Sequence, residues 1–388
     1  MKTTIRQLGC ALLILASGAA LAAEPEQCRT VRLGTVNWTD VVASSAVAEA
    51  LLDGLGYQVK QTSASQQIVL AGLADKQLDL FLGYWQPTMQ PVARPYLDKG
   101  RIEVIEPPTL ADAQSTYAVP SYVAEGGLKT FADIARFKDK LGGRIYAIEP
   151  GSGSNRITRK MIDDNRFGLK GFQLVESSEA GMLTAVKRAI KRKQWVVFFG
   201  WKPHPMNLQI DMTYLTGSED VFGPDEGAAT VSTMTAAGYQ AQCGNVARLL
   251  HNLRFSSAQV SQVMAPILDR TQPLDAARQW LKANPEPLKA WLDGVSTFDG
   301  KDGLAALQAD LRPDRRRQRL GGPQQTLHRQ LVVAQWRQAG GVAFHRRHDP
   351  FGAQFAALGA QQAALPVQHP ALLEQPHAQA LHRAGQAA

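Results

Sequence analysis

Between residues 28 and 311, a span of about 280 residues, the apolar positions follow two patterns, one typical of strands and one typical of helices. Apolar runs of strand length occupy 30–37, 57–61, 78–84, 144–148 and 194–200. Segments whose apolar residues recur at helical spacing are 44–55, 68–74, 156–164, 257–269 and 274–283. This alternation predicts α/β units built on mainly parallel sheets. The span is long enough for two lobes of ordinary domain size.

The first 23 residues have the pattern of a secretory signal peptide. Lys2 and Arg6 form a short basic region, an apolar stretch covers 8–21, and residues 20–22 (Ala-Leu-Ala) form an A-x-A cleavage site. The apolar stretch is too short to span a bilayer comfortably, although a retained membrane anchor is the alternative. We therefore expect residues 1–23 to be removed and the mature protein to be periplasmic.

The three cysteines leave one pair in the exported protein. Cys10 lies inside the apolar part of the signal peptide, so Cys28 and Cys243 remain. An even pair in an oxidising compartment is compatible with a disulfide, and two unpaired thiols are the alternative. No Cys-x-x-Cys motif or Cys/His cluster occurs that would argue for a metal, and we also expect no cofactor.

The formal net charge of +8 comes from the two ends of the chain. Residues 313–388 contain nine Arg, no Lys and three acidic residues, and Lys2 and Arg6 add two positive charges. Residues 24–312 therefore carry no net charge. This distribution argues against a nucleic-acid partner, because a nucleic-acid binder concentrates positive charge on its folded domain.

Residues 313–388 also differ in composition from the rest of the chain. They hold six of the eight His and thirteen Gln, and they show no sustained hydrophobic periodicity. We interpret this segment as a non-native or disordered extension without a functional role. A genuine disordered interaction tail is the alternative.

Residues with large or polar side chains gather where the predicted strands end. They are Trp38, Asp40, Trp85, Tyr117, Asn155 and Trp201. The three tryptophans directly follow predicted strands, Tyr117 lies in the extended segment 115–119, and Asn155 lies in a Gly/Ser-rich loop. In open α/β sheets, ligands bind beyond the carboxyl ends of the strands. We therefore expect these residues to form one ligand-binding site.

Several aromatic rings with one carboxylate suit a quaternary ammonium group. Such a group is cationic but has no N–H to donate, so hydrogen bonds cannot select it. Aromatic faces attract the cation and bury its methyl groups, and each contact contributes about 0.5–2 kcal/mol. Asp40 would add an opposite charge. Free backbone N–H groups at the start of the helix near Asn155 would suit a hydroxyl or carboxylate at the other end of the ligand.

Each of these residue types also has a structural alternative. A tryptophan at a strand end more often packs in the core than contacts a ligand, and we assign Trp195, Trp280 and Trp291 to the core. Asp40 is equally suited to cap the helix that follows it. His204 lies between two prolines and is expected to have a structural place.

Four motifs carry a resemblance to a known family. They are 36–40 (VNWTD), 80–85 (LFLGYW), 151–155 (GSGSN) and 200–207 (GWKPHPMN). In the type, order and spacing of these residues the chain resembles the periplasmic choline- and glycine-betaine-binding proteins of ABC importers, and the choline-binding type in particular. The similarity covers 28–311 and none of the C-terminal segment.

The resemblance implies an α/β fold of the periplasmic binding protein type (type II), with two lobes joined by a hinge and the ligand in the interlobe cleft. Lobe I would comprise 24–118 and 223–312, and lobe II would comprise 119–222. By the same resemblance, Trp38, Trp85, Tyr117 and Trp201 would surround the ammonium group, Asp40 would complement its charge, and Asn155 would contact the hydroxyl end. The protein would be a monomer that delivers its ligand to an ABC transporter permease.

Two classes of function compete on the residues alone. A binding protein is favoured over an enzyme on a bilobal scaffold, because no G-x-S-x-G motif occurs and only His204 and His251 lie in the body of the chain. Among ligands, choline is expected to bind best, with glycine betaine and carnitine as alternatives. The reason is that Asp40 would repel a ligand that carries its own carboxylate.

Overall fold

The apolar runs form the strands of one mixed sheet in the computed structural model, which describes residues 24–312. The strands are β1 (Thr30–Thr35), β2 (Gln58–Ser63), β3 (Leu80–Gln86), β4 (Ile102–Pro120), β5 (Arg144–Ala147), β6 (Gln173–Glu176), β7 (Phe198–Lys202), β8 (Met212–Tyr214) and β9 (Ala228–Ala236). Their order in the sheet is β2-β1-β3-β9-β4-β7-β5-β6, and β8 pairs with β4. The predicted signal peptide (1–23) and the C-terminal segment 313–388 lie outside the described residues.

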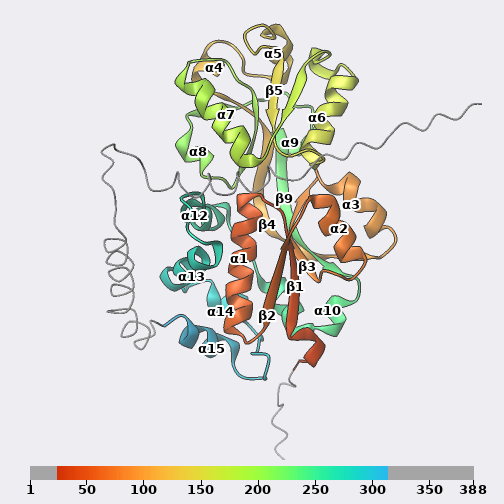
Figure 1. Cartoon of the computed structure of the whole chain (residues 1–388), viewed down its shortest axis with the longest axis vertical. Helices are drawn as coiled ribbons and strands as arrows, with labels where there is room; N and C mark the ends of the chain where they lie inside the picture. The colour runs from red at the N-terminus through yellow and green to blue at the C-terminus, as the bar shows by residue number, and fades with distance from the viewer. Residues whose placement is uncertain (1–23, 313–388) are drawn as a thin grey trace, which may run out of the picture. The chain divides into compact units, whose positions relative to one another are not determined.

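The long strand β4 divides this sheet into two parts. Its first part pairs antiparallel with β9, from Ile102 opposite Ala236 to Gln114 opposite Ala228. Its last part pairs antiparallel with β7 and β8. We call β1–β3, β9, the first part of β4 and their helices lobe I, and β5–β8, the end of β4 and their helices lobe II (Figure 1). The exact residue boundaries of the lobes given above stay predictions.

The sheet is less parallel than the sequence predicted. The pairs β1–β2, β1–β3, β5–β6 and β5–β7 are parallel, as expected of α/β units. The pairs that involve β4, β8 and β9 are antiparallel. The physical reason is that β4 and β9 run in opposite directions, because the chain passes from lobe I to lobe II along β4 and returns along β9.

Helices cover the sheet in both lobes (Figure 1). Those of lobe I are the 3₁₀ helix η1 (Glu26–Cys28), α1 (Thr39–Gly54), α2 (Gln66–Ala74), α3 (Gln90–Leu97), α10 (Tyr239–Gln242), α11 (Gly244–Asn252), α12 (Ser257–Leu268), α13 (Pro273–Ala283), α14 (Leu288–Trp291) and α15 (Gly303–Asp310). Those of lobe II are α4 (Ser121–Glu125), α5 (Phe131–Arg136), α6 (Gly153–Asp163), η2 (Arg166–Gly168), α7 (Glu179–Lys191) and α8 (Met206–Gln209). The short helix α9 (Pro224–Gly227) precedes β9.

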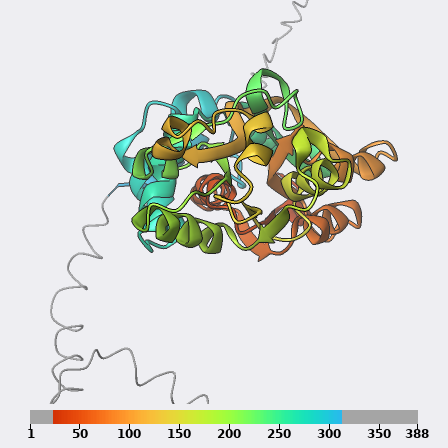
Figure 2. The same ribbon diagram turned by 90° about the horizontal axis from the view of Figure 1, so that it is seen from above.

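Helix α1 occupies the centre of the molecule. Eleven of its sixteen residues are buried, which is typical of a helix that is covered on all sides. Figure 2 shows it nearly end-on, surrounded by other elements. The helix begins five residues before the predicted segment 44–55 because Thr39, Asp40 and Val41 already have helical conformation. Its first turn therefore lies deep inside the protein, next to the predicted site.

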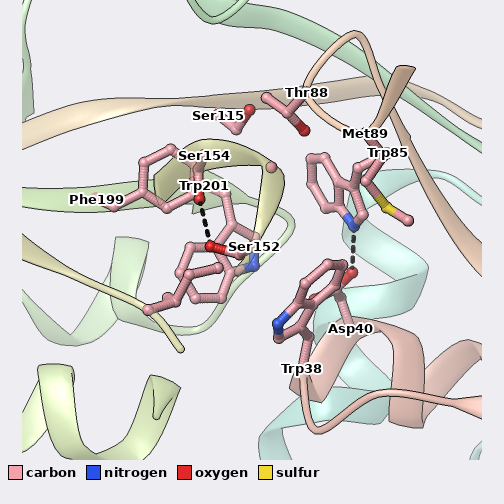
Figure 3. A pocket seen from close by; sticks show the side chains of 12 residues that line it. Trp38, Asp40, Trp85, Thr88, Met89, Ser115, Ser152, Ser154, Phe199 and Trp201 are labelled. Carbon is pink, nitrogen blue, oxygen red and sulfur yellow. Dashed lines mark hydrogen bonds between the residues drawn. The ribbon is translucent and has the colours of Figure 1, made fainter. Parts of the chain in front are cut away.

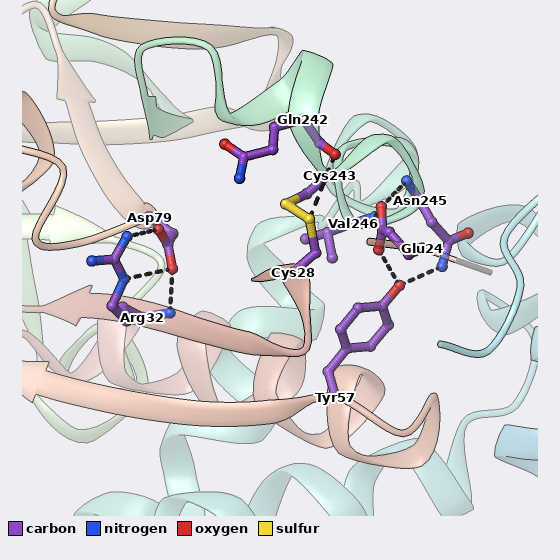
Figure 4. The surroundings of a disulfide bond; sticks show 9 residues. All are labelled: Glu24, Cys28, Arg32, Tyr57, Asp79, Gln242, Cys243, Asn245 and Val246. Carbon is purple, nitrogen blue, oxygen red and sulfur yellow. Dashed lines mark hydrogen bonds and ion pairs between the residues drawn. A yellow bond between two sulfur atoms is a disulfide. The ribbon is translucent and has the colours of Figure 1, made fainter. Parts of the chain in front are cut away.

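A disulfide fixes the start of the described chain to a distant segment. Cys28, at the end of η1, is bonded to Cys243, with their Cα atoms 5.6 Å apart (Figure 4). Beside it, Glu24 Oε1 accepts a hydrogen bond from the backbone N–H of Asn245 at 2.6 Å, and Asn245 Nδ2 donates to the Tyr57 hydroxyl at 2.7 Å. The amino-terminal segment is thus held on lobe I, away from the predicted ligand site.

The predicted core tryptophans behave differently from one another. Trp280 and Trp291 are buried and stack with ring centroids 6.1 Å apart, so their assignment to the core is confirmed. Trp195 is only half-buried and packs against Phe137 at the surface of lobe II.

Among residues 24–312, none of the helices combines the length and hydropathy that a membrane-spanning segment needs.

Candidate ligand-binding site

A pocket with an empty volume of about 370 Å³, partly open to solvent, lies where the two lobes meet (Figure 3). Lobe I and β4 contribute Trp38, Asp40, Trp85, Thr88, Met89 and Ser115. Lobe II contributes Ile148, Ser152, Gly153, Ser154, Phe199 and Trp201. Four of the six predicted site residues, which are Trp38, Asp40, Trp85 and Trp201, are therefore brought together here.

Four aromatic side chains form most of the apolar wall. Trp38, Trp85, Phe199 and Trp201 are each no more than 6% exposed. Trp85 lies within β3 and Trp201 within β7, rather than directly after a strand as predicted. The strands extend further than the apolar runs because β9 pairs with β3 as far as Gln86 and β4 pairs with β7 as far as Lys202.

Phe199 is a lining residue that the sequence did not single out. It lies two positions before Trp201 in the same strand, and the two ring centroids are 6.0 Å apart. Residues at i and i+2 of a strand face the same side of a sheet. This spacing was the signal that could have identified Phe199.

Asp40 is the buried charge of the pocket. Trp85 Nε1 donates a hydrogen bond to Asp40 Oδ2 at 2.9 Å, whereas Oδ1 is buried without a hydrogen-bond partner among the described residues. The side chain does not cap α1, so the alternative of a capping role does not apply. Burial, and next the negative charge of Glu179, raise the pKa of Asp40 to about 7, while the hydrogen bond from Trp85 opposes this rise.

Two more polar atoms of the lining are also buried without a partner in the described part of the chain. They are Ser115 Oγ and Trp201 Nε1. Buried polar atoms are nearly always hydrogen-bonded in folded proteins, so unpartnered ones need an explanation. Their position on the wall of one pocket, together with Asp40 Oδ1, indicates that this wall is built to face a ligand.

Tyr117 does not line the pocket, which corrects its predicted place in the aromatic box. Its side chain is fully buried in lobe II, stacked on Phe131 at 5.3 Å and packed against Phe222, with its hydroxyl bonded to Thr158. Tyr117 is opposite Phe199 in the β4–β7 pair, so the two side chains lie side by side on the same face of the sheet, with ring centroids 6.5 Å apart. Tyr117 therefore packs against Phe199 within the core of lobe II instead of reaching the pocket.

Asn155 also lies behind the lining rather than in it. It is the third residue of α6 instead of a loop residue, and its Nδ2 group donates to the backbone oxygens of Ile148 at 2.8 Å and Glu149 at 3.0 Å and to Glu176 Oε1 at 2.9 Å. These bonds use the amide N–H group of Asn155, whereas its Oδ1 atom is buried without a hydrogen-bond partner among the described residues. Asn155 instead shapes the turn between β5 and α6.

The turn that Asn155 shapes supplies hydroxyl groups to the pocket. Ser152 caps α6 by accepting a hydrogen bond from the backbone N–H of Asn155 at 3.3 Å. Its Oγ atom lies 3.3 Å from that of Ser154, and a dashed line marks this contact in Figure 3. The pocket thus has hydroxyl groups on its lobe II side, whereas its carboxylate is on the lobe I side.

This arrangement suits the binding of a small organic cation. Its aromatic faces attract positive charge and its single lining carboxylate complements it, while the hydroxyl groups can pair with a polar tail. Among residues 24–312, no group of three or more His, Cys, Asp or Glu side chains is placed to hold a metal ion. A two-lobed α/β fold with such a pocket between its lobes defines a solute-binding protein.

Comparison with known proteins shows the family. A model described as the substrate binding domain of ABC-type glycine betaine transport systems matches residues 29–283, and the chain belongs to this family. The protein is therefore the substrate-binding component of an ABC-type transport system. The predicted fold class and the choice of a binding protein over an enzyme are confirmed.

Individual relatives agree with this assignment. The chain is 47% identical to an ABC-transporter choline binding protein in complex with choline, with a TM-score of 0.73, over 74% of this chain and all of that one. The same comparison with an ABC-transporter choline binding protein in an unliganded semi-closed conformation gives 46% identity and a TM-score of 0.68, again over 74% of this chain and all of that one. The glycine betaine/carnitine transport binding protein GbuC of Listeria monocytogenes is 29% identical over 42% of this chain and 54% of its own length.

Proposed function

We propose that this protein captures choline outside the cytoplasm and delivers it to an ABC transporter permease. The observation that carries the proposal is the free oxygen of Asp40, Oδ1, which is buried in a pocket walled by three indole rings and one phenyl ring. A buried charge needs a counter-charge, and a quaternary ammonium group provides one without requiring a hydrogen-bond acceptor. The choline complex of the 47% identical relative supports this choice.

The acidic surroundings favour choline over ligands with a carboxylate. Besides Asp40, Glu149 lies close to the lining, because its Oε1 accepts a hydrogen bond from Nε1 of the lining residue Trp38 at 2.7 Å. Glycine betaine and carnitine would bring a third negative charge close to these groups. Choline ends instead in a neutral hydroxyl group, for which Ser115, Ser152 and Ser154 offer partners.

The roles that we propose for the site residues follow from their positions. Trp38, Trp85, Phe199 and Trp201 would surround the ammonium group, and Asp40 would supply the counter-charge. Tyr117 and Asn155 would act indirectly, by supporting Phe199 and by shaping the turn at Ser152. The mature protein would be a periplasmic monomer after loss of its signal peptide.

Calorimetric titration of the purified protein with choline, glycine betaine and carnitine tests the proposal. We expect choline to bind most tightly, with a quench or shift of tryptophan fluorescence because the rings contact the ligand. Tighter binding of glycine betaine or carnitine would overturn the choice of choline. Absence of binding for all three would overturn the assignment of the pocket.

Replacement of Trp85 by alanine is expected to weaken choline binding at least tenfold, which corresponds to about 1.4 kcal/mol. The change removes both one aromatic wall and the N–H group that Trp85 donates to Asp40. Titration calorimetry of Trp85→Ala against Trp195→Ala measures the effect, because Trp195 packs on the surface of lobe II and not in the pocket. Equal affinities of the two variants would place Trp85 outside the binding site.

A further inference from the structure

A second buried carboxylate joins the two lobes outside the pocket lining. Glu179, the first residue of α7 in lobe II, is 4% exposed. Its Oε2 atom accepts a hydrogen bond from the backbone N–H of Thr39 at 2.8 Å, and Oε1 accepts one from the Thr39 hydroxyl at 2.5 Å. Thr39 is the first residue of α1 in lobe I. The two residues are 140 positions apart in the sequence.

The start of α1 has no cap within its own lobe. The residue at the N-cap position is Trp38, and it makes no side-chain capping bond, because an indole ring has no acceptor for the backbone N–H groups. A carboxylate at this end is also favoured by the helix dipole. Glu179 therefore supplies from lobe II the hydrogen-bond acceptor for the first turn of α1 that the N-cap residue of lobe I does not offer. It can do so only while the two lobes are in contact.

His204 holds Glu179 in place within lobe II. Its Nδ1 atom accepts a hydrogen bond from the backbone N–H of Met206 at 2.9 Å, so the hydrogen of the neutral ring is on Nε2, which lies 3.0 Å from Glu179 Oε1. The ring is 2% exposed and meets the edge of Trp201 at 4.9 Å between ring centroids. The structural place predicted for His204 is thus the orientation of Glu179.

These contacts connect lining residues of lobe I to a lining residue of lobe II. Thr39 stands between the lining residues Trp38 and Asp40, and His204 packs on the lining residue Trp201. Two further bonds cross between the lobes nearby, from Trp38 Nε1 to Glu149 and from Gln67 Nε2 to the Gly151 carbonyl oxygen at 2.6 Å. Of these crossing contacts, only that of Glu179 uses a carboxylate that is held by a second buried side chain.

We propose that Glu179 is a positioning residue that holds the two lobes in the closed arrangement without touching the ligand. We call Glu179, together with its contacts to Thr39 and His204, the latch. Its carboxylate, oriented by His204, caps α1 across the cleft and so sets the lifetime of the closed state. Ligand choice is left to the pocket. The proposal rests on the function proposed above only in that closure retains a ligand.

Two variants break the latch from opposite sides. Glu179→Gln removes the charge while the side chain keeps its size. Thr39→Pro removes both donors, and proline suits the first position of a helix, where the preceding Trp38 already has the extended backbone that a residue before proline adopts (φ −98°, ψ 128°). Glu125→Gln is the matched control, because it removes an exposed carboxylate elsewhere in lobe II.

Stopped-flow tryptophan fluorescence with choline gives the first readout. We expect each latch variant to release choline about tenfold faster than the wild-type protein, because a charge-assisted hydrogen bond is lost on the closed side only. The association rate and the preference for choline over glycine betaine should not change. An unchanged release rate in both variants, or a change that appears only in ligand preference, would overturn the latch.

A second readout needs no ligand and separates this proposal from the assignment of choline. Spin labels on cysteines introduced at Lys60 in lobe I and at Leu208 in lobe II, both exposed, report the distance between the lobes. In the ligand-free protein, Glu179→Gln and Thr39→Pro should broaden the distance distribution toward longer values, and Glu125→Gln should not. Distributions equal to that of the wild type would overturn the latch even if choline binds, whereas broadened ones would support it even if choline does not. If Glu179→Gln fails to fold, Thr39→Pro alone decides.

Discussion

Replacement of Gly153 by alanine is expected to weaken choline binding about 100-fold and to leave both lobes folded. Gly153 is the first residue of α6 in lobe II, and it lies against the backbone of Thr88 in lobe I. An added Cβ atom would lie 2.7 Å from the Thr88 carbonyl carbon and closer still to its oxygen. Because this neighbour is backbone, the overlap can be relieved only by moving the lobes apart. Overpacking of this kind costs up to about 3 kcal/mol, which is about 100-fold in affinity.

The local backbone at position 153 is compatible with alanine. Gly153 does not have a positive φ angle, and alanine favours a helical position over glycine. The clash therefore concerns closure alone. Titration calorimetry measures the affinity of Gly153→Ala, and thermal unfolding shows whether its stability is preserved.

Gly244→Ala is the matched control for this experiment. Gly244 is likewise the first residue of a helix, α11, and an added Cβ atom would meet nothing within 4 Å. We expect its affinity to equal that of the wild type. If the Gly153→Ala protein is folded and binds choline with wild-type affinity, binding does not require the close contact between Gly153 in lobe II and the Thr88 backbone in lobe I.

The strands of high apolar content were predictable from the sequence, and the strands that join the lobes were not. β1, β3 and β5 were found to within about two residues at each end. β4 contains Pro107 and Pro108, which argue against a strand, and its register with β9 shifts between Ile105 and Leu110. β9 consists largely of Ala and Thr. Such segments become strands because of partners far away in the sequence, and a local pattern does not contain that information.

The site shows the same division between local and long-range information. Trp38, Trp85 and Trp201 could be placed near strand ends because a tryptophan that follows an apolar run can be recognised from the sequence alone. Whether a side chain reaches the pocket depends on its neighbours in space, and Tyr117, which lies beside Phe199 on the same face of the sheet, is covered by Phe131 and Phe222. Glu179 could not be assigned at all, since its role exists only through Thr39 in the other lobe.

The affinity for choline is expected to fall about 30-fold when the pH is lowered from 8 to 5.5. In the proposed site the cation requires ionised Asp40, and the pKa of Asp40 is raised to about 7 by burial and by the charge of Glu179. About 90% of such groups are ionised at pH 8 and about 3% at pH 5.5. Because a raised carboxyl pKa favours the neutral form below it, binding weakens as the pH falls, and choline itself does not titrate in this range.

Proton release provides a direct check of this linkage. Near pH 7, about half of the empty molecules carry a protonated Asp40, so each binding event should release about half a proton, which calorimetry in two buffers of different ionisation enthalpy measures. Asp40→Asn should bind more weakly at every pH and should lose the dependence between pH 5.5 and 8. The other titratable groups that face this region are Glu149, Glu179 and His204. Should Asp40→Asn keep the wild-type pH profile, one of these groups would be responsible and Asp40 would not be the counter-charge of the ligand.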